Sequence, residues 1–358
     1  MEDFDALWRL LFKEKELITE IMIWFERTYL LKKTRIKTLE KLIMNELASL
    51  VTDMKDIKTD VVAQIIEQIM RERNGEEIPK EIIANVIQML IKIDVYKPYF
   101  EPELLRISEK FYREESQRLI DPEHIENFDI VGYLKHTDRR VNEEINRCSE
   151  YLDKSTENKL VLLIERIFIS DNLQTILSHG FDSLVDTKNL ECLSKLYYFL
   201  EKVGKLDFLK KTWGYYIKQR GTSIMNEAEL SVEKILDYKR DLEKILIECF
   251  KRNGSLKSAM QFALEDCVNL KTNKIAELTS KHLDEILKHA HKISQEESEV
   301  EEKLDDVISI FRFLSAKDIF EAFYNKRLVK RILFGQTSSD DLERRMIEKL
   351  KQGNNQFE

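Results

Sequence analysis

Residues 305–335 read DDVISIFRFLSAKDIFEAFYNKRLVKRILFG, and this stretch decides the fold because its apolar and aromatic residues recur at helical spacing. Apolar side chains three or four positions apart form the buried face of an α-helix. The stretch therefore predicts two helices that meet at a short joint, residues 315–318. Ser315 is followed three residues later by the acidic Asp318, a pattern typical of a helix start, so Ser315 is the predicted cap of the second helix. The buried faces are expected to hold Val307, Ile310, Phe311, Phe313, Leu314, Ile319, Phe320, Phe323, Leu328, Ile332 and Leu333.

The second of these helices also carries a cluster of basic side chains. They are Lys326, Arg327, Lys330 and Arg331. Such a cluster can attract an acidic partner, an import receptor or a nucleic acid, and nucleic-acid binding would depend steeply on salt. More often a basic run is a solvated face whose aliphatic stems lie along apolar surface. We favour the solvated face, because Phe320 and Phe323 are expected to pack on the opposite side of the helix.

The composition of the whole chain favours helices. Among 358 residues there are only 9 glycines and 4 prolines, and Pro122 is the last proline. Strand signals, such as Asn-Gly between alternating apolar residues, are nearly absent. A hydrophobic content of 43% can bury a substantial core, and a net charge of −8 with 35% charged residues is typical of mixed-charge helix surfaces. We therefore predict an all-α protein that does not bind nucleic acid.

The sequence also argues against secretion and membrane insertion. No run of about 18 uncharged apolar residues is present, and acidic residues stand among the first ten, where a secretory signal would be basic and then apolar. We expect a location in the cytoplasm, the nucleus or both. The four cysteines lie far apart without a CxxC pair, which predicts reduced thiols and no zinc or disulfide framework. They are Cys148, Cys192, Cys249 and Cys267.

No catalytic motif is recognisable. The sequence has no glycine-rich phosphate loop, no GxSxG, no HExxH and no cysteine paired with a positioned histidine, so we predict neither an enzyme nor a bound cofactor. The best metal candidate is His282, Glu285 and His289, which can share one helix face, whereas His291 would point elsewhere. A surface helix with incidental histidines is the more common explanation, and no metal is expected.

The helical pattern restarts along the chain. Residues 1–31 predict helices with an apolar stripe at Leu7, Leu11, Ile18, Ile21, Phe25 and Tyr29. Similar groups of helices end near Leu30, Leu152 and Phe250, at comparable intervals. Such spacing indicates a helical solenoid in which each unit buries its apolar face on the next. Coincidence within an ordinary all-α chain is the alternative.

The pattern within residues 305–335 resembles the signature of the cullins, the scaffold subunits of multisubunit ubiquitin ligases. The matching residues are Phe311, Arg312, Phe313, Leu314, Lys317, Asp318, Phe320, Phe323, Tyr324, Lys326, Arg327 and Leu328. Three further segments are similar to phrases of that family: RERNGEEI at 71–78, FYREESQRLI at 111–120 and YLDKSTENKL at 151–160. The resemblance thus extends over nearly the whole chain.

This resemblance implies an elongated solenoid of five-helix cullin repeats, followed by the first helices of a four-helix bundle. The first repeat is expected to be truncated, with only its end over residues 1–33. A second repeat would occupy 34–155 and a third 156–270. Residues 271–358 would then begin an incomplete C-terminal cullin domain.

The function implied by the resemblance is that of a non-catalytic scaffold of a cullin-RING ubiquitin ligase. A rigid stalk would separate a substrate adaptor, bound at the first repeat, from a RING-box protein bound through a C-terminal portion absent here. The attachment site for a ubiquitin-like modifier is also expected outside this chain. YIKQRGTSIM at 216–225 and FRFLSAKDIFEAFY at 311–324 lean toward the subclass with a β-propeller adaptor over the BTB-type subclasses. The alternatives are a tethering or other multisubunit scaffold, and a truncated cullin paralogue without a RING subunit.

The residues at the end of the first predicted helix are the candidates for adaptor binding. They are Trp24, Phe25, Arg27, Thr28 and Tyr29. Aromatic and arginine side chains concentrate interface energy because they bury large areas at small entropic cost. In cullins the corresponding helix of the first repeat helps to grip the adaptor. Trp24 and Tyr29 cannot both be central on one helix stripe, so we expect one to face the adaptor and the other the core. For each residue, core packing is the alternative.

Overall fold

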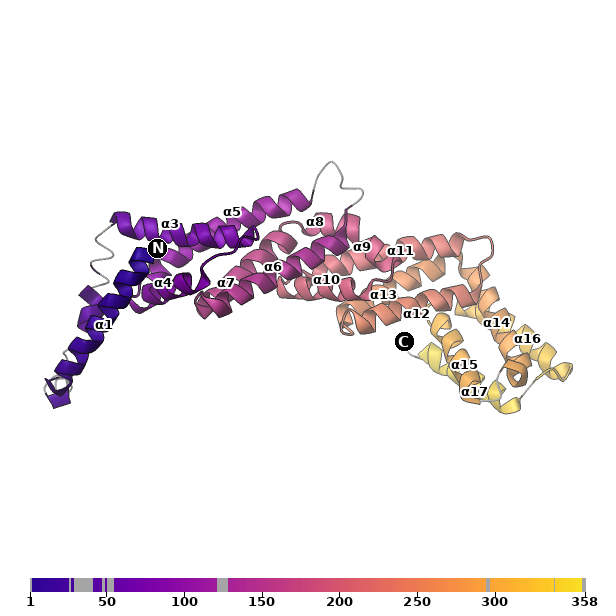
Figure 1. Cartoon of the computed structure of the whole chain (residues 1–358). Helices are drawn as coiled ribbons and strands as arrows, with labels where there is room; N and C mark the ends of the chain where they lie inside the picture. Colours follow the sequence, from indigo (N-terminus) through magenta and orange to yellow (C-terminus); the bar gives the residue numbers. More distant parts are fainter. Residues whose placement is uncertain are drawn as a thin grey trace. The chain divides into compact units, whose positions relative to one another are not determined.

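The computed structural model of the protein describes residues 2–25, 27–28, 41–46, 49, 55–120, 128–293, 297–337 and 339–355. Throughout these ranges the regular structure is helical and no strand occurs, so the predicted all-α class is confirmed. The chain divides into two compact units, residues 1–176 and 177–358, whose helices are labelled in Figure 1. We call them unit 1 and unit 2. The division of the sequence into repeats stays a prediction.

Unit 1 consists of amphipathic helices whose apolar faces are buried against one another. Its main helices are α1 (Glu2–Phe25), α3 (Lys55–Arg73), α4 (Lys80–Lys92), α5 (Glu101–Leu119), α6 (Ile130–Glu150) and α7 (Lys154–Glu165), with π-helical turns η2 (Tyr96–Phe100) and η4 (Arg166–Ser170) and the short α8 (Leu173–Thr175). Ile65, Ile83, Phe100 and Leu160 lie fully buried in the core. Aspartate caps fix the starts of two helices: the Asp129 side chain accepts a hydrogen bond from the Gly132 amide at the start of α6, and the Asp153 side chain accepts one from the Ser155 amide at the start of α7.

A buried ionic network joins three helices of unit 1. The Glu144 carboxylate of α6 accepts hydrogen bonds from Arg73 Nε of α3 at 2.9 Å, from Arg147 Nη1 at 2.6 Å and from the Tyr112 hydroxyl of α5. The side chains of Arg73 and Glu144 are completely buried. Burial alone would raise the pKa of Glu144, but the charges of both arginines and the hydrogen bonds lower it from 4.5 to about 2. Glu144 is therefore a carboxylate that unit 1 keeps ionised in its interior.

We expect unit 1 to lose stability on acidification through this carboxylate. The folded pKa of Glu144 lies below its unfolded value, so its contribution is complete above about pH 5 and is lost as the pH falls toward 2. A shift of this size corresponds to about 3 kcal/mol of unfolding free energy. Urea unfolding followed by circular dichroism across this pH range measures the loss. The variant Glu144→Gln cannot ionise and should give a flatter pH profile, and identical profiles would contradict the prediction.

Unit 2 holds the remaining helices. They are α9 (Phe181–Asp186), α10 (Leu190–Lys202), α11 (Leu206–Asn226), α12 (Val232–Glu248), α13 (Gly254–Val268), α14 (Thr272–Ile293), α15 (Glu297–Phe311), α16 (Lys317–Leu333) and α17 (Asp340–Asn355), with the turns η5 (Ile176–Gly180) at its start and η6 (Asn269–Lys271) before α14. Trp213 is fully buried and contacts Phe181 and Phe250 edge to face. Gly221 lets α11 approach α13, because a Cβ there would lie 2.6 Å from Cys267 Sγ.

The two helices predicted within residues 305–335 are confirmed as the end of α15 and as α16, but their joint differs from the prediction. Ala316 precedes α16 and provides no side-chain cap. Ser315 instead donates hydrogen bonds from its amide and its hydroxyl to Asn269 Oδ1, both at 2.9 Å. The predicted serine cap is wrong because Ser315 is held by η6, which is remote in sequence.

Two of the predicted buried positions on α16 are also wrong. Ile332 and Leu333 are exposed, Leu333 to 75%. The helix turns Phe320 and Tyr324 into the core, and Leu333 lies on the side opposite to them. Periodicity identified the helix correctly, but it did not locate the edge of its buried face.

The basic cluster on α16 is solvated only in part. Lys326 and Lys330 are exposed as predicted, whereas Arg331 is completely buried. The Arg331 guanidinium donates hydrogen bonds to Asp284 Oδ1 of α14 and to Glu343 of α17, from Nε to Oε1 at 2.7 Å and from Nη2 to Oε2 at 3.0 Å. The predicted solvated face is therefore wrong for Arg331, because two carboxylates compensate its charge inside unit 2.

Candidate functional site

Helix α1 packs against α4 with one face. Trp8 and Phe12 are half-buried there, and the Lys92 ammonium of α4 lies 4.0 Å from the centre of the Phe12 ring. One turn further on, the buried Lys15 places its own ammonium 4.4 Å from the same ring centre. The Lys92 contact joins this face of α1 to α4, whereas the Lys15 contact lies within α1 itself.

The opposite face of α1 carries a second apolar stripe with no cover among the described residues. It consists of Leu10, Leu17, Ile21 and Trp24, and we call it the α1 stripe. These positions recur at heptad spacing, and with 3.6 residues per turn they lie about 180° around the helix from Trp8 and Phe12. Ile21 and Trp24 are each 76% exposed. Exposed apolar side chains in this arrangement are typical of a helix that docks on a partner.

Three of the five residues predicted for adaptor binding are exposed at the end of α1. They are Trp24, Arg27 and Thr28, and the Thr28 hydroxyl donates a hydrogen bond to the Trp24 carbonyl oxygen. Tyr29 and the side chain of Phe25 lie outside the described residues. Leu10 and Leu17 are not among the residues named from the sequence, and Ile21 is named there only as part of an apolar stripe. Leu10, Leu17 and Trp24 are seven positions apart, and this spacing in the sequence could have indicated a second apolar face.

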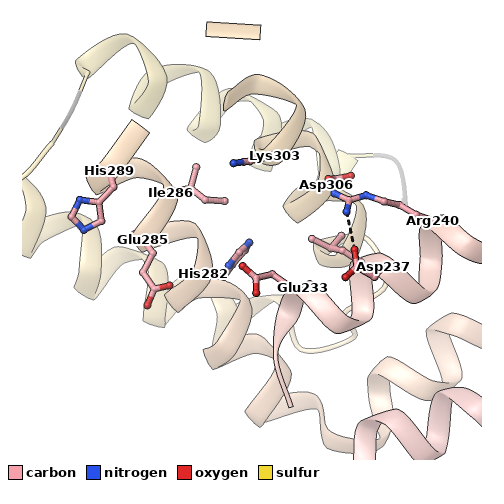
Figure 2. A pocket seen from close by; sticks show the side chains of 10 residues that line it. Glu233, Asp237, Arg240, His282, Glu285, Ile286, His289, Lys303 and Asp306 are labelled. Carbon is pink, nitrogen blue, oxygen red and sulfur yellow. Dashed lines mark hydrogen bonds and ion pairs between the residues drawn. The ribbon is translucent and has the colours of Figure 1, made fainter. Parts of the chain in front are cut away.

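A large hollow in unit 2 contains the predicted metal candidates (Figure 2). It measures about 700 Å³ and lies among α12, α14 and α15. Arg240 of α12 donates to Asp237 Oδ1 at 3.0 Å and to Asp306 of α15, so these charges pair with one another. His282 points toward Glu233, whereas His289 points away from it.

The histidines of this hollow do not form a metal site in the part of the chain that the structure describes, where no group of three His, Cys, Asp or Glu side chains is placed to hold an ion. The helix that carries these residues is also kinked. The backbone of His289 has φ −119° and ψ 20°, so α14 bends there and the face that includes His282 and Glu285 is interrupted.

The four cysteines are buried free thiols. Burial raises the pKa of Cys148 to about 12 and that of Cys249 to about 11, so both remain protonated at neutral pH. A protonated, buried thiol is a poor nucleophile, and these residues serve packing. Among the described helices, none is long and apolar enough to span a bilayer.

Comparison with known proteins extends the resemblance to the whole chain. Residues 1–357 match the model of the cullin alpha solenoid domain. The chain is 31% identical to Cullin-4 of Dictyostelium discoideum and to Cullin-4A of Homo sapiens over 355 residues, covering 98% of this chain and 43% and 46% of those proteins. It is 30% identical to Cullin-3A of Arabidopsis thaliana over 365 residues, covering 98% of this chain and 48% of that protein.

The chain therefore spans about half the length of the curated relatives it matches. The cullin signature of α15 and α16, the all-helical units and the match over residues 1–357 agree with one another. On these grounds the chain belongs to the cullin family.

Proposed function

We propose that this chain is a scaffold portion of a cullin-RING ubiquitin ligase and that it binds a substrate adaptor through the α1 stripe. The observation that carries the proposal is an α1 helix with two opposite apolar faces, of which α4 covers only one. Ile21 and Trp24 are each 76% exposed, so covering them with a partner removes apolar surface from water and favours docking. Arg27 and Thr28 would stand at the polar end of the same surface.

The scaffold role requires no chemistry from the chain itself. Holding a substrate near a charged ubiquitin-conjugating enzyme raises the effective concentration of the acceptor lysine. Buried networks such as Arg73–Glu144 and Arg331–Glu343 suit this role, because they fix the positions of helices within each unit. We assign recruitment of the RING-box protein and attachment of a ubiquitin-like modifier to the portion of cullins that this chain does not match. We propose that the ligase that contains this chain is located in the cytoplasm, the nucleus or both.

The identity of the adaptor is part of the proposal. The chain is similar to both Cullin-4 and Cullin-3 proteins, with 31% and 30% identity. We favour a β-propeller adaptor, on the sequence of residues 216–225, with a BTB-type adaptor as the alternative. Titration calorimetry with one purified adaptor of each type distinguishes them. We expect the β-propeller adaptor to bind with the higher affinity.

Substituting Ile21→Glu tests the docking surface. A carboxylate in the middle of the α1 stripe would have to lose its hydration on binding, so we expect adaptor affinity to fall by roughly 30-fold or more. The matched control is Ile247→Glu on α12, which also replaces an exposed isoleucine and should leave affinity unchanged. Adaptor binding by Ile21→Glu at the affinity of the unmodified chain, or no binding of either adaptor by the unmodified chain, would contradict the proposal.

A further inference from the structure

Unit 2 has a second hollow, which is lined by aromatic as well as charged side chains, unlike the one in Figure 2. It measures about 780 Å³ and is formed by α12, α13 and α15. Met260 is buried at this site, Phe313 is partly buried against the core of unit 2, and Phe262 stands at its wall. We call it the Phe262 groove. It is built from residues that the α1 stripe does not include.

The Phe262 side chain is 69% exposed, so its apolar ring is not needed to fill the core. Helix α13 buries Met260, Ala263, Leu264 and Cys267, and Phe262 lies on the opposite side of the helix. The neighbouring lining positions on that side, Ser258, Gln261 and Glu265, are polar. An exposed aromatic ring beside a groove is the kind of side chain that anchors a protein–protein contact.

The charge of the groove is opposite in sign to that of the chain. Its lining has three cations and two carboxylates, whereas the whole chain has a net charge of −8. Lys239 and Glu243 pair with each other at 2.9 Å. Among the described residues no ion pair is made by Lys257, Arg312 or Glu265, so two cations and one carboxylate are available to a ligand. The available charge favours an acidic ligand.

We propose that the Phe262 groove binds a peptide segment of a partner protein in which a large apolar side chain is flanked by carboxylates. The apolar side chain packs on Phe262 and Phe313, and the carboxylates pair with Lys257 and Arg312. Arg312 can bind a carboxylate through two parallel hydrogen bonds, which gives the contact direction as well as charge. The residues of this groove are distinct from those of the α1 stripe.

Selection from a display library of random peptides on the purified chain tests this inference. We expect enriched peptides to combine a large apolar residue with Asp or Glu, and to bind more weakly as ionic strength rises. Affinity measured by fluorescence polarisation with one enriched peptide should fall about tenfold or more in Phe262→Ala and in Arg312→Glu. Because both side chains are exposed, these variants should keep the thermal midpoint of the unmodified chain.

The matched control is Phe208→Ala. Phe208 of α11 is also exposed and has the ammoniums of Lys205 and Lys211 each 5.9 Å from its ring centre, but it does not line the groove. This variant and Ile21→Glu should bind the peptide normally. Enrichment of basic peptides, no enrichment at all, or equal binding by Phe262→Ala and the unmodified chain would overturn the inference.

Discussion

Replacing Glu144 with alanine is expected to lower the unfolding free energy of unit 1 by about 3–5 kcal/mol. The substitution leaves the guanidiniums of Arg73 and Arg147 facing each other in the interior, without the carboxylate that both of them bind. It also removes the acceptor of the Tyr112 hydroxyl. Burying an uncompensated charge costs more than the net value of the original pair, which is why the expected effect is large.

The unfolding midpoint in urea measures the effect, and a surface ion pair serves as its control. Glu150 pairs with Lys80 at 2.6 Å, but both side chains are about half exposed. Glu150→Ala should therefore cost less than about 1 kcal/mol. If Glu144→Ala unfolds at the same urea concentration as Glu150→Ala, the buried network does not stabilise unit 1.

Replacing Arg331 with methionine is expected to lower the unfolding free energy of unit 2 by about 3–5 kcal/mol. Methionine fills a similar space but leaves the carboxylates of Asp284 and Glu343 buried without their shared cation. Because these carboxylates belong to α14 and α17, the loss should weaken the attachment of both helices to α16. Thermal unfolding followed by circular dichroism measures it.

Lys330→Met is the control for this substitution. Lys330 precedes Arg331 on α16 and is exposed, so its replacement should change stability by no more than about 0.5 kcal/mol. Equal thermal midpoints for the two variants would show that Arg331 behaves as part of a solvated basic face, as its sequence context suggested.

The buried partners in these two networks could not be predicted from the sequence. Helical periodicity was sufficient to identify the all-α class and the two helices of residues 305–335, because the spacing of apolar residues along a helix is a local property. The burial of Arg331 depends on Asp284, 47 positions away, and on Glu343, 12 positions away. Arg73 and Glu144 are 71 positions apart. Partners this distant are brought together only by tertiary packing.

The candidate site was predicted in part for a similar reason. Trp24, Arg27 and Thr28 were selected as interface residue types and are exposed. Ile21 is predicted to lie on a single apolar stripe of residues 1–31 and is not among the adaptor-binding candidates. The helix has two such faces, and a sequence with apolar residues on both sides does not reveal which one its own core covers. The kink at His289 likewise interrupted a helix face that ideal geometry had made continuous.

Amide hydrogen exchange of the chain with and without its purified adaptor tests most directly whether α1 is the docking helix of a scaffold. We expect slower exchange over residues 6–24 in the complex and unchanged exchange over α11 and α13, which contribute nothing to the α1 stripe. Adaptor-dependent protection elsewhere in the chain, with α1 exchanging as fast as in the free protein, would contradict the proposed role.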